Sequence, residues 1–152
     1  MNLKIICVGR LKEAYWRAAI TEYTKRLSGY KINIIEVKSV NTDDVNKNIL
    51  LEGEAISKNI MSDDYVIALE VEGKIIDSET FASDIKTHYL YSAAPITFVI
   101  GGSDGLSADI KSRANSGLSF GRMTYPHQLM RVILLEQLYR AMMINSNRSY
   151  HK

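Results

Sequence analysis

Short, largely apolar runs alternate along the chain with longer stretches that are apolar on one side only. Three of these runs, at residues 3–8, 66–69 and 96–100, have the length of strands. A strand that is apolar throughout is typical of a parallel sheet covered by helices on both faces. The pattern therefore predicts an α/β fold in one domain, residues 1–152, with a mostly parallel sheet and helices on both faces.

The expected elements follow the order βαβαβαβαβα. We expect strands at residues 3–8, 32–37, 65–71, 96–100 and 118–120, and helices at 12–27, 45–60, 78–89, 107–114 and 127–145. Asp43 or Asp44 is expected to cap the second helix and Ser78 the third, because short polar side chains can accept from free amides there. Glu72-Gly73-Lys74 is expected to turn the chain after the third strand.

The expected last helix, residues 127–145, carries apolar side chains all round its axis. A helix of this kind has to be buried on more than one side. One side can pack on the sheet, and an identical subunit could cover the other, which predicts a homodimer. Burial of the whole helix within a single chain is the alternative.

The chain has 19 Lys/Arg and 17 Asp/Glu residues, but the charges are unevenly spread. Residues 101–152 hold seven basic and three acidic side chains, so this part could meet a polyanion such as a nucleic acid. A solvated face with a chance asymmetry is the alternative. The single Cys7 lies in the first apolar run, which favours a buried, inert thiol. Without a signal peptide or a membrane-length segment, the protein is expected in the cytoplasm, with no membrane partner.

Ligands of parallel sheets bind beyond the carboxyl ends of the strands. The loop Gly101-Gly102-Ser103-Asp104-Gly105-Leu106 follows a buried strand, and glycine there lets a ligand approach the backbone closely. A tight turn is the alternative. A Walker A motif, a dinucleotide fingerprint and the glycine loop of the usual Rossmann methyltransferases are all absent, since the first strand ends in the single Gly9. The three histidines lack metal-ligand spacing, so no metal is expected.

Several motifs together resemble the RlmH family of SPOUT-class methyltransferases. They lie at residues 98–106, 118–128, 131–132, 136–141 and 150–152, with further matches at 8–13, 22–27 and 69–74. The resemblance covers essentially the whole chain, and only the segment near residues 40–48 looks short. It implies a trefoil knot formed by the C-terminal segment, and a homodimer that uses S-adenosylmethionine (SAM). The implied reaction is methylation of N3 of a pseudouridine in 23S rRNA, in the assembled ribosome.

The resemblance also implies individual site residues. The implied cofactor contacts are Leu69, Gly101, Phe120, Gly121, Arg122, Met123, Thr124 and Tyr125. The candidates for catalysis are Arg140, Tyr150 and His151, and those for RNA binding are Arg148 and Lys152. A base or a cation is needed near the target because its N3–H must lose a proton. The alternatives are an ion pair between Arg140 and Glu136, and a frayed terminus.

Two other classes of protein share parts of this pattern. A ribosome-associated protein could have the fold without catalysis, and its lack of SAM affinity would distinguish it. A receiver-type signalling domain needs acidic side chains after its first strand, where this chain has Cys7-Val8-Gly9-Arg10. The receiver class is therefore rejected.

Overall fold

The computed structural model describes residues 1–92 and 94–150, in which strands and helices alternate as expected. The elements are β1 (Asn2–Val8), α1 (Ala14–Arg26), β2 (Lys31–Val37), α2 (Val45–Ser57), β3 (Tyr65–Ile75), α3 (Ser78–Tyr91), β4 (Ile96–Ile100), α4 (Ala108–Arg113), β5 (Ser116–Ser119) and α5 (His127–Asn145). No described helix is long and apolar enough to cross a membrane.

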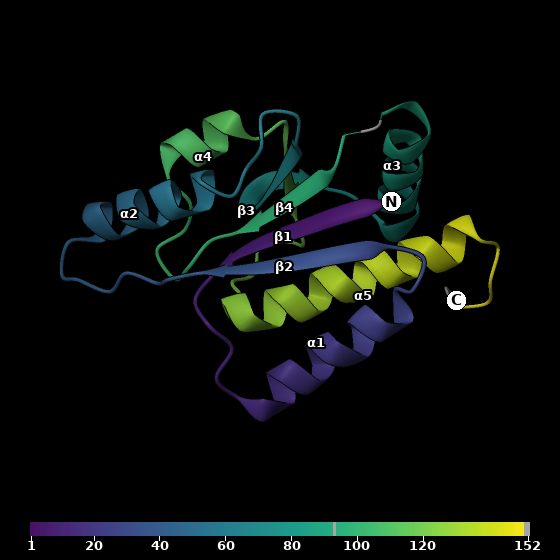
Figure 1. Ribbon diagram of the computed structural model, residues 1–152, viewed down its shortest axis with the longest axis horizontal. Helices are drawn as coiled ribbons and strands as arrows, with labels where there is room; N and C mark the ends of the chain where they lie inside the picture. Colours follow the sequence, from purple (N-terminus) through teal and green to yellow (C-terminus); the bar gives the residue numbers. More distant parts are fainter. Residues whose placement is uncertain (93, 151–152) are drawn as a thin grey trace.

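The strands form one parallel sheet in the order β2-β1-β4-β3-β5. Figure 1 shows α1 and α5 together on one face of this sheet and α2 and α4 on the other. Side chains of β1 alternate between the two layers: Ile5 packs in the cluster that contains α3 and α5 residues, and Ile6 in the cluster of α2 and α4. Both are at most 1% exposed, as the apolar run predicts.

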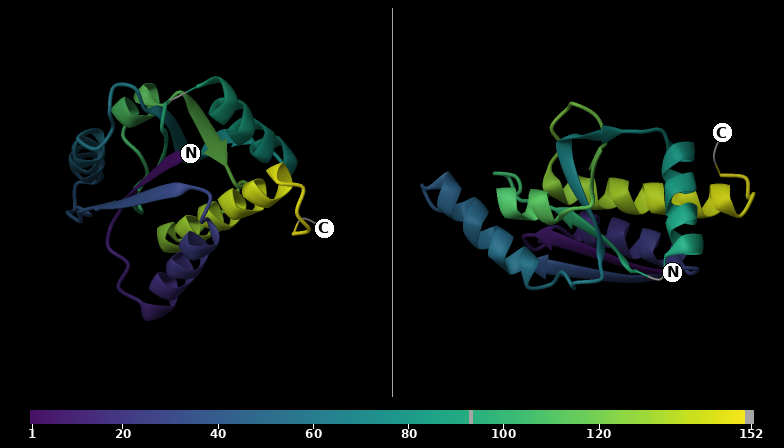
Figure 2. Two further views of the ribbon diagram at one scale, coloured as in Figure 1. Left: turned by 45° about the vertical axis from the view of Figure 1, so that its right-hand side comes forward. Right: turned by 90° about the horizontal axis from the view of Figure 1, so that it is seen from above.

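Helix α5 crosses its face of the sheet between α1 and α3, which Figure 2 shows from two further sides. Its side chains Leu134, Leu135 and Leu138 are fully buried against the sheet and these helices. The first and third helices of the same chain thus cover sides of α5 for which the sequence suggested a second subunit. Much of the apolar surface of α5 is therefore buried within a single chain, as the alternative interpretation expected.

Strand β3 differs from the expectation, because Glu72-Gly73-Lys74 lies inside the strand and does not turn the chain. The register with β5 shifts between Leu69 and Lys74, so the strand continues past an irregularity. Gly73 passes so close to β5 that a Cβ there would lie 2.7 Å from backbone atoms of Leu118. The glycine serves close strand packing, which a one-dimensional pattern cannot distinguish from a turn.

The helix caps are partly as expected. Asp44 caps α2 by accepting from the Lys47 amide at 3.1 Å, as one of the two alternatives proposed. The cap of α3 is Asp77, which accepts from the Thr80 amide at 2.7 Å. The prediction of Ser78 as the cap is therefore wrong: Ser78 is the first helical residue, and its hydroxyl donates to Gln137 of α5.

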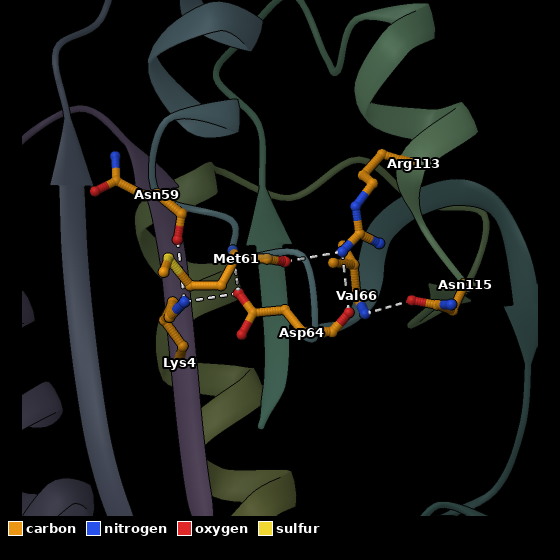
Figure 3. A network of polar contacts seen from close by, with 7 residues as sticks. All are labelled: Lys4, Asn59, Met61, Asp64, Val66, Arg113 and Asn115. Carbon is orange, nitrogen blue, oxygen red and sulfur yellow. Dashed lines mark hydrogen bonds and ion pairs between the residues drawn. The ribbon is translucent and has the colours of Figure 1, made fainter. Parts of the chain in front are cut away.

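A polar network joins β1, β3 and α4 near the amino ends of the strands (Figure 3). The Lys4 ammonium donates to Asp64 Oδ2 at 2.6 Å, and Arg113 donates to the Asp64 carbonyl oxygen at 3.1 Å. The Asn115 side chain accepts a hydrogen bond from the Val66 amide, next to the point where β3 and β5 begin to pair at Ile67 and Ser116. Burial is the largest single influence and would raise the pKa of Asp64, but the hydrogen bonds from Lys4, the Met61 amide and Thr97, with the charge of Lys4, together lower it.

Candidate functional site

A cavity of about 380 Å³ opens at the carboxyl ends of β4 and β5 and beside residues 69–72 of β3, at the edge of a parallel sheet where ligands bind. It is lined by residues 69–72, 100–106, 118–121 and 123–125, and by Lys111, His127 and Met130. Three loops far apart in the sequence therefore meet at one place. They are the loops after Leu69, Ile100 and Phe120 that the sequence pattern indicated, although β3 continues beyond Leu69.

The glycine-rich loop of this cavity folds tightly on itself. A Cβ on Gly101 would lie 2.9 Å from the carbonyl carbon and oxygen of Gly105, and the Gly105 amide donates to the Gly102 carbonyl oxygen at 3.1 Å. Gly105 has a φ of +88°, which favours glycine. Gly101 is thus required first by the closure of the loop, and the closed loop presents backbone to the cavity.

The lining combines apolar walls with charged groups. Leu69, Phe120 and Met123 offer surfaces for a flat, largely apolar ring such as adenine, and the loop backbone offers hydrogen-bonding groups beside them. Lys111 of α4 forms an ion pair with Glu70 of β3, with 3.3 Å between the ammonium nitrogen and the carboxylate oxygen. These residues suit a ligand that joins a flat apolar ring to a charged end.

His127 begins α5 and lines the same cavity. Burial and the nearby charge of Arg131 lower the pKa of His127, so its imidazole is neutral at neutral pH. Arg131 is 1% exposed and donates to the carbonyl oxygens of Val8 and Gly9 and to Glu36. This buried cation fixes the carboxyl ends of β1 and β2 beside the cavity.

Seven of the eight residues implied as cofactor contacts line this cavity. They are Leu69, Gly101, Phe120, Gly121, Met123, Thr124 and Tyr125. Arg122 lies in the same loop but is exposed and does not line the cavity. The cavity is also lined by Glu70, Asp104, Lys111 and His127. Periodicity does not indicate these four residues, and only their positions next to strand ends could have suggested them.

Arg140 and Tyr150 come together at a different place. Tyr150 donates to Glu136 Oε1 at 3.2 Å, the same oxygen that accepts from Arg140, and the Arg140 guanidinium lies 4.8 Å from the centre of the Tyr150 ring. The ion pair between Arg140 and Glu136 that was the alternative is therefore present. The hydrogen bond with Glu136 raises the pKa of Arg140. Burial raises the pKa of the Tyr150 hydroxyl, and the negative charge of Glu136 raises it further.

This cluster of Glu136, Arg140 and Tyr150 lies well along α5 from the cavity. Arg140 follows the lining residue Met130 by ten positions, which is about 15 Å along a helix axis. Within one chain, Arg140 and Tyr150 are thus separated from the cavity. Arg148 is exposed beyond the end of α5, and His151 and Lys152 lie outside the described residues.

The basic character of residues 101–152 is largely used inside the fold. Arg131 pairs with Glu36, Arg140 with Glu136 and Lys111 with Glu70, while Arg113 binds carbonyl oxygens near the start of β3. Four of its basic side chains thus have partners within the fold, while Arg122 and Arg148 are exposed. Within the described part of the chain, no group of three His, Cys, Asp or Glu side chains is placed to hold a metal ion.

Comparison with known proteins gives consistent results. Residues 1–151 match a family described as "Predicted SPOUT methyltransferase". Proteins named "Ribosomal RNA large subunit methyltransferase H" are 50% identical in Clostridium novyi (strain NT), 51% in Clostridium botulinum (strain Okra / Type B1) and 46% in Lactobacillus delbrueckii subsp. bulgaricus, each over the full length of both chains. A solved structure, that of a probable methylase family protein from Haemophilus influenzae Rd KW20, has a TM-score of 0.59 at 13% identity, and covers 99% of this chain and 70% of that one. This last likeness concerns the fold alone.

Proposed function

The chain belongs to the SPOUT methyltransferases, and within them to the ribosomal RNA large subunit methyltransferase H family; on this premise we propose that it uses SAM to methylate N3 of a pseudouridine in 23S rRNA. The observation that carries the proposal is the cavity at the ends of β4 and β5 and beside residues 69–72 of β3, where the glycine-rich loop and the loop after Phe120 meet. It joins a tight backbone cradle to apolar walls, which suits an adenosyl group.

We propose that SAM lies in this cavity, with its adenine between Leu69, Phe120 and Met123. When bound, SAM supplies a methyl group on a positively charged sulfur. The chain's own contribution is to hold that methyl group in line with the target nitrogen and to exclude water, because displacement at a sulfonium depends mainly on positioning. Gly101 allows the loop to close around the ligand.

The target nitrogen must lose its proton, and the negative charge that develops on the uracil ring has to be stabilised. Arg140 stays protonated beside Glu136, so we propose that it provides this positive charge, with Tyr150 beside it and His151 as a further candidate. Since the cluster lies about 15 Å along α5 from Met130, we propose that it acts on a base bound at the cavity of a second copy of the chain. The active unit is then a homodimer in the cytoplasm.

The remaining parts of the proposal concern the RNA and the chain path. Arg148 and Lys152 are proposed to contact phosphates near the target, and the assembled ribosome is the proposed substrate. The trefoil knot implied by the family would place the loops of the cavity in a fixed mutual arrangement. Each of these points stays a prediction.

A methylation assay tests the proposed function directly. Purified protein, labelled SAM and 23S rRNA from a strain that lacks the modification are combined, once as intact ribosomes and once as free rRNA. We expect methyl transfer to N3 of a pseudouridine, and calorimetry without RNA should show binding of SAM. Binding of SAM without transfer to either substrate, or no binding at all, would favour the alternative of a binding protein without catalysis.

A further inference from the structure

Helix α2 presents two buried polar side chains to the glycine-rich loop, although neither of them lines the cavity. Asn48 is 1% exposed, and its Nδ2 donates to the Thr42 carbonyl oxygen at 2.9 Å and to Asp104 Oδ2 at 3.3 Å. Its Oδ1 accepts from Thr42 as well. Asn48 therefore contacts Asp104, which does line the cavity.

One turn further along α2, Glu52 places a second carboxyl group against the same loop. Glu52 is 4% exposed, and its Oε1 accepts from the Val40 amide at 2.9 Å. Its Oε2 is buried and has no hydrogen-bond partner among the described residues. A Cβ on Gly102 would lie 3.1 Å from this oxygen, so the carboxyl group lies directly against the backbone of the loop.

Among the residues that the structure describes, Glu52 forms no ion pair. Burial raises the pKa of Glu52, the Val40 amide lowers it, and the negative charge of Asp104 raises it again, with a net rise. The neighbours from β1, from the segment after β2 and from α2 itself are Val8, Val40 and Asn48, none of which carries a charge. A buried carboxyl group of this kind is either protonated or, when ionised, favours a cation nearby.

We propose that Glu52 and Asp104 together supply the negative charge by which this loop favours the sulfonium form of the cofactor over its thioether product. The inference rests on the proposed function. Methyl transfer removes one positive charge from the sulfur and leaves the rest of the cofactor unchanged, so charge is the largest difference between the two ligands. Asp104 lines the cavity and determines specificity; Glu52, behind the loop, is a positioning residue that adds its field through Gly102.

The other acidic groups of the lining are less suited to this role. Glu70 is neutralised by its ion pair with Lys111. Glu72 belongs to β3 and not to the glycine-rich loop. A bound product that has lost its sulfur charge would thus be held less tightly at Asp104, which favours exchange of product for fresh cofactor.

Calorimetry of SAM and of S-adenosylhomocysteine, the thioether product, tests the proposal. We expect Asp104→Asn and Glu52→Gln each to weaken SAM binding at least fivefold and to change product binding by less than twofold. The matched controls are Glu54→Gln and Asp109→Asn, which remove exposed charges outside the cavity on α2 and α4. Both controls should bind each ligand as the wild type does.

The pH dependence adds a readout that a purely structural role of Glu52 would not change. A cation binds the charged carboxylate better, so SAM affinity should rise with pH through the raised pKa of Glu52 and level off above it. His127 also titrates in the cavity and is common to all variants. The portion of the pH dependence of SAM affinity that disappears in Glu52→Gln therefore reports on Glu52. For the product, we expect Glu52→Gln to leave the pH dependence of binding unchanged.

The outcomes separate the two proposals. If the wild type binds neither ligand, the proposed function fails. If both ligands bind but Asp104→Asn and Glu52→Gln leave their affinity ratio unchanged, the proposed function stands and this inference is overturned. Should Glu52→Gln fail to fold, Asp104→Asn at its exposed position decides the question alone.

Discussion

At the scale of single residues, buried charges organise both ends of the sheet. Lys4 and Asp64 form an ion pair near the amino ends of the strands, and Arg131 binds the carboxyl ends of β1 and β2. The side chains of Asp64 and Arg131 are at most 2% exposed. A buried charge of this kind is tolerated only with partners, so removal of a partner should be costly.

The Lys4–Asp64 pair predicts a pH-dependent stability. The pKa of Asp64 is lowered in the folded state, so its contribution is complete above the unfolded value of about 3.9 and is lost as pH falls through the lower folded value. We expect Asp64→Asn to reduce the free energy of unfolding at pH 7 by about 2–3 kcal/mol. Denaturant unfolding between pH 2.5 and pH 7 should show this difference shrinking below about pH 4.

The neighbouring Asp63 provides the control, because its side chain is exposed. Asp63→Asn should unfold like the wild type at every pH. An equal loss of stability for Asp64→Asn at pH 3 and pH 7 would show that the hydrogen-bond geometry matters and the charge does not.

At the scale of elements, the contact between β3 and β5 links the fold to the site. Gly73 lies inside β3, and β5 leads directly into residues 118–121 of the cavity lining. The close approach at Gly73 therefore determines where this lining segment begins. Sequence alone suggests a turn at this glycine, but the tertiary structure uses it for strand packing.

Replacement of Gly73 tests this role. A Cβ there would lie 2.7 Å from the backbone N and C of Leu118, and backbone cannot move aside as a side chain can. We expect Gly73→Ala to lower the free energy of unfolding by about 2–3 kcal/mol and to weaken SAM binding. Gly29→Ala is the control, because its Cβ would meet only the flexible side chain of Met142 at 3.3 Å. Similar melting temperatures for both variants would contradict the packing role.

At the scale of the whole molecule, the distance between the cavity and the Arg140 cluster is the reason for the proposed second copy. Helix α5 connects the two within a chain, from His127 and Met130 at the cavity to Arg140 near its other end. The apolar surface of α5 no longer argues for the dimer by itself, since α1 and α3 cover part of it. The argument for a homodimer now rests on the separation of the two sites.

Mixing two inactive variants tests this arrangement. Gly101→Ala should lose SAM binding, because its Cβ would strike the Gly105 backbone, and Arg140→Gln should bind SAM but fail to transfer methyl groups. After subunit exchange, half of the dimers are mixed and each has one complete site, so about a quarter of wild-type activity should return. Activity that stays at zero in a mixture shown to exchange, or a wild-type monomer at micromolar concentration in sedimentation, would refute the shared site.

The amino-acid sequence by itself determined the alternation of strands and helices, the burial of the sheet on both faces and the late glycine-rich loop. Each of these follows from the spacing of apolar residues and glycine over a few positions, which is a local property. The family motifs added eight expected cofactor contacts, seven of which the structure gathers around one cavity.

Only the tertiary structure decided how distant segments meet. It joined Glu52 of α2 to the loop at Gly102, brought Gly73 against Leu118, buried Arg131 beneath Val8 and Gly9, and separated Arg140 from the cavity. These contacts join residues about 45 to 123 positions apart, or depend on the path of a helix through the core. Periodicity reports which face of an element is buried, but the partner on that face is fixed by packing of the whole chain.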